Sequence, residues 1–150
     1  MRGTTHLVGG LLAGAMVGAG LRGLPDLAGF GAAGLAALIP DWIQVNLPGG
    51  NRLVHGVFGH RGLSHWLITA GLVWWIVRWF APDLALYALA GWVSHIALDV
   101  ISGGAPALWP LPWRIELAHI KSGGALDMIL GSASLLLTVV LVIWQWIQHF

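Results

Sequence analysis

The sequence predicts an all-α membrane protein, a polytopic helical bundle of about five transmembrane helices that forms one domain over residues 1–150. Three observations support this prediction. Of the 150 residues, 57% are hydrophobic and 9% are charged, and the mean hydropathy is +0.80, whereas a soluble domain carries about 25% charged residues. Five apolar segments are separated by stretches that contain Gly and Pro. Ten Trp residues fit the headgroup level of a bilayer, where aromatic side chains gather.

Composition also excludes several classes of protein. The formal net charge of +1 is too small for a nucleic-acid binder that is held by phosphate contacts. The chain contains no cysteine, so it has neither a disulfide framework nor a thiolate metal site. Any metal ion must therefore be held by nitrogen and oxygen ligands from His, Asp or Glu.

The first two predicted helices are rich in small residues. The segment at about 5–21 contains recurring Gly, which lets helices pack closely in lipid, and His6 lies at its start. We therefore interpret it as a helix of the bundle and not as a signal peptide. The segment at 27–39 is short for a crossing, because about 20 residues span the hydrocarbon core. Its Gly and Ala content predicts burial against other helices, and Pro40-Asp41 is expected to end it.

The remaining three segments complete the predicted bundle. One runs over 64–80. The next begins at Pro82-Asp83, where a proline in the first turn of a helix costs no hydrogen bond, runs to about Ile101 and stops at Ser102-Gly103-Gly104. The last runs over about 125–147.

Two long loops, 42–59 and 102–124, alternate with two short connections, 22–26 and 81–83. If all five segments cross the membrane, both long loops lie on the same face as the N-terminus. Lys and Arg are more frequent on that face than on the other: Arg2, Arg52, Arg61, Arg114 and Lys121, against Arg22 and Arg78. The positive-inside rule therefore places the face with the long loops in the cytoplasm.

Histidine and aspartate residues gather at the same face, where the apolar segments begin or end. These residues are His6, Asp41, His60, His65, His95 and Asp99, and Asp127 opens the last segment. Imidazole and carboxylate groups brought together from separate helices are the ligands that a zinc or similar ion requires. The sequence thus predicts a site for one to three divalent metal ions, with Zn²⁺ as the expected metal.

The motif His95-x-x-x-Asp99 is the sharpest part of this prediction. Its two side chains lie one helical turn apart on the same face. An ionisable pair within a membrane segment is costly, so it points to a function. The simpler alternative is a His–Asp hydrogen bond that only supports packing.

The second motif is His60-Arg61-Gly62-Leu63-Ser64-His65. Gly62 permits a tight turn that would aim both imidazoles at one point, and the planar fork of Arg61 suits a phosphate oxygen. The alternative is an interfacial cap in which both histidines are solvated and Arg61 reaches into the headgroups.

Other candidates are weaker when they are taken singly. Asp41 after a proline is a common turn residue, and His6 near a headgroup needs no special role. Asp127 can act as a ligand, orient one, or favour the N-terminus of the last helix as a negative charge. Lys121, Arg114 and His119 are accessory candidates in the second loop, and a solvated histidine is the simpler interpretation of the last of these.

Four stretches together resemble the YdjM-type inner-membrane proteins, which are described as membrane-bound metal-dependent hydrolases. They are Thr5-His6, Leu38-Ile39-Pro40-Asp41, the motif at 60–65 and Gly91-x-x-Ser94-His95-x-x-x-Asp99. Three positions depart from the family pattern: Ile43 stands where a second acid is frequent, Ser64 replaces Thr, and Asp127 replaces Glu. The resemblance implies a multi-pass inner-membrane protein with a His/Asp metal centre. The order of the ligands is also similar to the zinc-dependent phospholipase C and single-strand nuclease group, which implies cleavage of phosphoesters.

We therefore predict a membrane-embedded metal-dependent hydrolase, a phosphoesterase that acts on a lipid-borne phosphate at the cytoplasmic interface. A bound ion would lower the pKa of a water molecule toward ~7. Asp41 or Asp99 would bridge two ions or act as the base. Arg61 would neutralise the phosphoryl oxygens, helped by Lys121 or Arg114 from the second loop. Two alternatives stay open: a metal-ion transporter that uses the same ligands, and a non-catalytic membrane scaffold.

Overall fold

A computed structural model of the chain describes residues 1–21, 26–46, 62–108 and 113–149. These residues form six α-helices and one short 3₁₀ helix, which confirms the predicted all-α class. The helices are α1 (Gly3–Gly20), α2 (Leu27–Ala36), α3 (Ile39–Asn46), α5 (Leu67–Phe80), α6 (Pro82–Ser102) and α7 (Ala125–Gln148), and the 3₁₀ helix η1 (Leu63–His65) precedes α5. Within the described ranges, the extended pairing is limited to an isolated bridge between Ala105 and Ile115.

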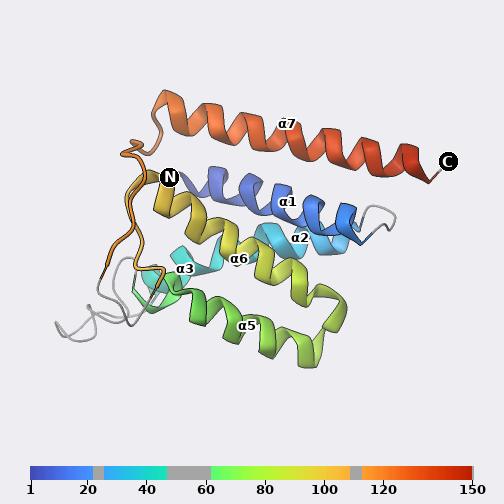
Figure 1. Cartoon of the computed structure of the whole chain (residues 1–150), viewed down its shortest axis with the longest axis horizontal. Helices are drawn as coiled ribbons and strands as arrows, with labels where there is room; N and C mark the ends of the chain where they lie inside the picture. The colour runs from blue at the N-terminus through green and yellow to red at the C-terminus, as the bar shows by residue number, and fades with distance from the viewer. Residues whose placement is uncertain (22–25, 47–61, 109–112, 150) are drawn as a thin grey trace.

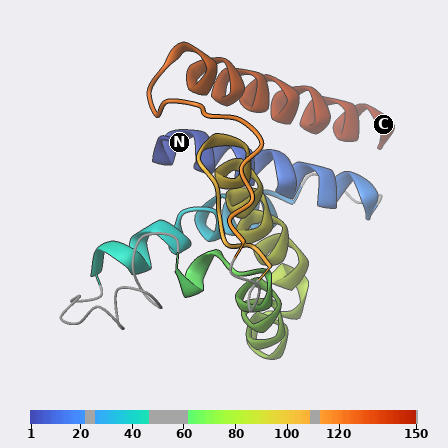
Figure 2. The ribbon, with the colours of Figure 1, turned by 60° about the vertical axis from the view of Figure 1, so that its left-hand side comes forward.

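The helices are arranged around α6. In Figure 1, α7 lies along α1, α1 and α2 lie beside α6, and α5 runs back along the other side of α6. The start of α1, the end of α6, the start of α7 and the α3–η1 region lie together at one end of the bundle, and Figure 2 shows the same grouping. Residues from distant parts of the sequence thus meet at the end where the long loops were predicted.

Small residues let α1, α2 and α6 approach one another closely. A Cβ atom on Gly10 would lie 2.6 Å from Ala37 Cβ and 2.7 Å from the carbonyl oxygen of Ala33. A Cβ atom on Gly91 would overlap the same Ala33 carbonyl group from the α6 side. Such contacts are closer than side chains tolerate, so glycine at both positions is what allows the three helices to meet.

Two of the described helices are long and apolar enough to cross a membrane. They are α6, with a mean hydropathy of 1.6, and α7, with a mean hydropathy of 2.3. The large apolar side chains of α7 are mostly exposed, as in a helix that faces lipid. The apolar stretch Leu27–Ile43 and helix α5 are shorter. The structure thus supports two candidate spans, and crossing by all five predicted segments stays a prediction.

The structure corrects the prediction that Pro40 ends the second helix. Helix α2 already ends at Ala36, and after a turn at 37–38 Pro40 lies in the first turn of α3. A proline is tolerated there because the N–H group that it lacks would have no partner within the helix. The predicted loop at 42–59 therefore begins as a helix up to Asn46, and its residues 47–59 lie outside the described ranges.

The segment after α6 stays close to the end of that helix. The backbone N–H groups of Leu117 and Ala118 donate to the carbonyl oxygens of Val100 and Ile101 at 2.9 and 3.0 Å. Carbonyl groups in the last turn of a helix have no helical partner. These hydrogen bonds therefore complete the end of α6 and hold the second predicted loop against it.

Candidate metal centre

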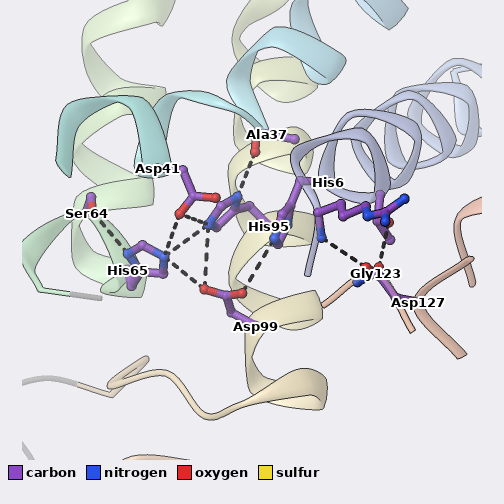
Figure 3. A network of polar contacts seen from close by, with 11 residues as sticks. His6, Ala37, Asp41, Ser64, His65, His95, Asp99, Gly123 and Asp127 are labelled. Atoms are coloured by element: carbon purple, nitrogen blue, oxygen red, sulfur yellow. Dashed lines mark hydrogen bonds and ion pairs between the residues drawn. The ribbon is translucent and has the colours of Figure 1, made fainter. Parts of the chain in front are cut away.

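Five predicted ligand residues converge at the end of the bundle where α6 terminates (Figure 3). His6 comes from α1, Asp41 from α3, His65 from η1, and His95 and Asp99 from α6. One ligand atom from each of Asp41, His65, His95 and Asp99 lies within 4.8 Å of the others. Four separate helical elements therefore bring imidazole and carboxylate groups close enough for several of them to share one ion.

His95 and Asp99 form the rigid part of this cluster, because both lie on the same face of α6. The Nε2 atom of His95 lies 3.8 Å from Asp99 Oδ2 across one helical turn. His95 is 0% exposed and Asp99 is 3% exposed. Burying such groups is costly unless they are paired, hydrogen-bonded or bound to a metal.

His65 faces this pair from η1. Its Nε2 atom lies 3.0 Å from Asp99 Oδ2 and 3.0 Å from His95 Nε2, and its Nδ1 atom lies 3.0 Å from the hydroxyl oxygen of Ser64. The indole N–H of Trp92 donates to the carbonyl oxygen of Ser64 at 2.9 Å. Helix α6 therefore fixes the turn that carries His65 as well as contributing two residues of its own.

The hydrogen bond of His95 to the backbone decides which of its nitrogen atoms faces the cluster. Its Nδ1 atom lies 2.7 Å from the carbonyl oxygen of Ala37, which can only accept, so Nδ1 donates. In a neutral imidazole the lone pair then resides on Nε2, and that atom faces Asp41, Asp99 and His65. A backbone carbonyl on the outer nitrogen is the usual arrangement around a metal-binding histidine.

The donor atoms of this cluster fit a metal ion. Carboxylate oxygens of Asp41 and Asp99 lie 3.7 and 3.8 Å from the Nε2 atom of His95, which carries the lone pair. Such acceptors repel one another unless a proton or a cation lies between them. Imidazole nitrogen with carboxylate oxygen suits Zn²⁺ and other divalent first-row metals. The cluster could therefore hold a divalent ion.

His6 joins the cluster through His95 and Asp99. The rings of His6 and His95 stack, with centroids 4.0 Å apart and an interplanar angle of 24°. The Nε2 atom of His6 lies 3.5 Å from Asp99 Oδ1. His65 and His95 approach the other oxygen of this carboxylate, Oδ2. The Nδ1 atom of His6 is buried and has no hydrogen-bond partner among the described residues. His6 is thus held by fewer bonds of its own than His95.

Asp41 lies at the open side of the cluster. Its Oδ1 atom lies 3.9 Å from His65 Nε2 and 3.7 Å from His95 Nε2. Its side chain is 41% exposed, whereas the side chains of His65 and Asp99 are 0% and 4% exposed. Among the described residues, the cluster is therefore open to solvent past Asp41 on α3.

The remaining predicted site residues fall into three groups. His60 and Arg61 lie outside the described residues. Arg114, Lys121 and His119 are exposed on the segment before α7, where His119 Nδ1 lies 2.9 Å from Glu116 Oε1. Asp127 is buried but does not face the cluster: it accepts hydrogen bonds from the backbone of Arg2 and Gly123 and from the hydroxyl of Thr5.

Three groups that support the histidines were not predicted from the sequence: the carbonyl of Ala37, the hydroxyl of Ser64 and the indole of Trp92. Ser64 directly precedes His65 in the motif at 60–65, and this adjacency could have indicated that its hydroxyl contacts the ring of His65. Ala37 contributes only its backbone, which no side-chain pattern reveals. Trp92 is indistinguishable in sequence from the other tryptophans of an apolar helix.

Comparison with known proteins identifies the family. The YdjM inner membrane protein family matches residues 1–150, so the chain belongs to this family and the resemblance seen in the sequence is confirmed. The uncharacterized protein YvsG of Bacillus subtilis (strain 168) is 29% identical over 133 residues, a match that covers 82% of each chain. No solved structure matches the chain.

Proposed function

We propose that this member of the YdjM inner membrane protein family is a metal-dependent hydrolase, which cleaves a phosphoester carried by a lipid at the cytoplasmic interface of the membrane. One observation carries the proposal: four helical elements deliver three imidazoles and two carboxylates to the same place. Ionisable groups are rare and costly in membrane segments, and those that occur usually mark a functional site.

The ligand set would consist of His65, His95, Asp41 and Asp99, with His6 as a further ligand. Asp99 is suited to bridge two ions, because its Oδ2 atom faces His65 and His95 whereas its Oδ1 atom faces His6. A divalent ion supplies Lewis acidity, which lowers the pKa of nearby water and stabilises negative charge on phosphoryl oxygens.

Proton transfer is assigned to Asp41. Its carboxylate lies at the open side of the cluster, and it approaches the nearest imidazole nitrogen only to 3.7 Å. While its Oδ1 atom would serve as a ligand, the other carboxylate oxygen of Asp41 would take a proton from a water molecule, whereas both oxygens of the buried Asp99 face histidines and would serve only as ligands. Arg61, four positions before His65 in the same motif, would pair with the phosphoryl oxygens.

The position of the cluster along α6 favours a lipid-borne substrate. Asp99 lies in the last turn of Pro82–Ser102, which is a candidate membrane span. The cluster therefore lies near the end of the apolar length of this helix, which supports a site at the depth of the headgroup phosphates. The excess of Lys and Arg that the sequence predicts for this face supports a cytoplasmic position.

Transport of the ion is the less favoured alternative. A transport site needs a polar path from the cluster toward the far end of the bundle. One turn before His95, however, Gly91 is packed directly on the carbonyl of Ala33, and Gly10 closes on Ala33 and Ala37 from α1. Among the described residues, the space beyond the cluster between α1, α2 and α6 is therefore filled by close backbone contacts.

The test is a phosphoesterase assay on the purified chain in bilayer discs, combined with elemental analysis of bound metal. The wild-type protein is expected to contain a divalent ion, to hydrolyse phosphomonoesters, phosphodiesters or phospholipids, and to lose this activity in a chelator. Asp99→Ala is expected to lose both metal and turnover. Asp83→Ala is the matched control, because Asp83 lies on the same helix at its other end and is exposed.

Three results would contradict the proposal. Hydrolysis that survives both the chelator and Asp99→Ala would exclude the metal mechanism. Bound metal without turnover of any ester would retain the metal site and reject the hydrolase. A protein that binds no metal would leave the cluster with a structural role, as in the scaffold alternative.

A further inference from the structure

At the start of α7, a single carboxylate outside the cluster joins three segments of the chain. Asp127 is 1% exposed and lies in the first turn of this helix. Its Oδ2 atom accepts hydrogen bonds from the backbone N–H of Arg2 at 3.1 Å and of Gly123 at 2.6 Å, and its Oδ1 atom accepts one from the hydroxyl of Thr5 at 2.6 Å (Figure 3). Asp127 thus ties the beginning of α1 to the turn before α7.

This carboxylate takes the place of a side-chain cap at the start of α1. Helix α1 follows Arg2 and helix α7 follows Gly124, and neither residue provides a side-chain cap. The first N–H groups of a helix have no helical partner, and a negative charge close to them is favourable. Asp127 meets both needs for the start of α1, although it belongs to a helix more than a hundred residues later in the chain.

Two of the residues that Asp127 holds, Arg2 and Thr5, fix the backbone that leads into His6. The carbonyl oxygen of Arg2 accepts the backbone N–H of His6 at 3.2 Å, and Thr5 directly precedes His6. The outer nitrogen atoms of His65 and His95 are held by Ser64 and by Ala37, whereas Nδ1 of His6 has no partner among the described residues. The place of the His6 ring therefore depends on the backbone of the first turn of α1.

We infer that Asp127 is a positioning residue for the metal centre, which fixes the first turn of α1 so that His6 stays against Asp99 and His95. This inference rests on the proposed metal-binding function, and it assigns Asp127 no contact with the ion. Removing a group that holds a metal ligand typically weakens metal affinity by about 10- to 100-fold. Because Asp127 acts through the backbone, we expect the lower end of this range.

The experiment is a Co²⁺ titration of the purified chain in detergent, followed by visible absorption, which reports the ligand set. Asp127→Asn is expected to weaken Co²⁺ binding by about tenfold and to shift the spectrum toward that of His6→Gln. Adding Asp127→Asn to His6→Gln should cause no further loss of affinity, because the ligand that Asp127 positions is already gone. Thr5→Val removes one of the three hydrogen bonds and should shift both readouts in the same direction by less.

Asp83→Asn is the control, since it removes the charge of another first-turn aspartate at the far end of α6. A merely structural role for Asp127 predicts a lower unfolding temperature with an unchanged Co²⁺ spectrum, and that result would overturn the inference. Additive losses in the double variant would overturn it as well. If Asp127→Asn does not fold, Thr5→Val decides the question by the same spectral criterion.

Failure of the inference and failure of the proposed function give different results. If the wild-type chain binds no Co²⁺, the proposed function is overturned, and the positioning role falls with it. If the wild-type chain binds Co²⁺ and Asp127→Asn binds it equally well with the same spectrum, only the positioning role is overturned.

Discussion

The two ends of the bundle use polar side chains differently. At the end far from the cluster, Asp26 accepts the backbone N–H of Gly29 at 2.9 Å and so caps α2. Gln145 of α7 donates to the carbonyl oxygen of Ala15 at 2.8 Å. In each pair, a side chain meets a backbone group of the opposite hydrogen-bonding character, which is the ordinary way in which polar side chains stabilise a fold, although Gln145 Oε1 has no hydrogen-bond partner among the described residues.

At the cluster end, groups of the same character face one another. The Nε2 lone pair of His95 and the carboxylate oxygens of Asp41 and Asp99 point at one small region. The Nε2 atom of His65 lies 3.0 Å from both His95 Nε2 and Asp99 Oδ2 and can donate to one of them at a time, whereas a cation can bind several of these acceptors together. Burial of polar residues therefore does not by itself distinguish a site from a structural contact; the direction and the character of the polar atoms do.

The largest expected difference in metal affinity is between two single variants, each of which removes an aspartate from one end of the bundle. Asp99→Ala removes a proposed ligand. Loss of a group that only supports a ligand costs up to about 100-fold in metal affinity, so Asp99→Ala should cost more than this. Asp26→Ala removes a helix cap, so it should lower the free energy of unfolding by about 1 kcal/mol and leave metal affinity unchanged. Metal content and thermal unfolding of the two variants measure both quantities. Equal metal binding by Asp99→Ala and Asp26→Ala would remove the distinction between the ends.

Metal addition should stabilise the fold through the cluster end only. An ion that binds the native state stabilises it by about 2.7 kcal/mol when its free concentration is 100 times the dissociation constant. We expect the unfolding temperature of the wild-type chain to rise on addition of Zn²⁺ and to return to its starting value in a chelator. Asp26→Ala should show the full rise and Asp99→Ala should show none. A rise of the same size in Asp99→Ala would indicate that the metal binds elsewhere.

The close-packed middle of the bundle, which separates the two ends, should be sensitive to one added methyl group. Gly91→Ala forces a Cβ atom against the carbonyl of Ala33, and such overpacking destabilises by about 1–3 kcal/mol. Gly71→Ala is the matched control, because no heavy atom lies within 4 Å of the Cβ position there. That control should be neutral or stabilising by up to about 1 kcal/mol, since alanine favours a helix. Equal unfolding temperatures for both variants would contradict the packing described for α2 and α6.

The sequence predicts α6 and α7 nearly to the residue, because local signals define their ends. Pro82 begins α6, and the glycines after Ser102 end it, as expected from their backbone chemistry. Helix α3 was not predicted because a proline has two opposite effects: it ends a helix when it lies in the interior, but it is favourable in the first turn. Which of the two applies depends on how Ile39–Asn46 packs, and the local sequence does not contain that information.

The site was predictable as far as it follows from spacing and from the alternation of helices. His95 and Asp99 lie on one helix, so their approach follows from its period alone. The approach of His6, Asp41 and His65 follows from the order of the apolar segments along the chain. The tautomer of His95 and the bonds of Asp127 were not predictable, because both depend on backbone groups brought in from other helices.

The smallest expected effect on metal affinity comes from replacing a serine. Two serines, Ser64 and Ser94, each directly precede a histidine of the cluster and can be compared. Ser64 lies 3.0 Å from the ring of His65, whereas the hydroxyl of Ser94 donates to the carbonyl oxygen of Gly91 within its own helix and does not support His95. Ser64→Ala should therefore weaken metal affinity by about tenfold or less, because one support of a ligand is lost. Ser94→Ala should leave the affinity within about twofold, because the support of His95 comes from the backbone of Ala37. Metal titrations of the two variants measure the difference, and an equal loss in both would show that orientation by outer hydrogen bonds does not control this centre.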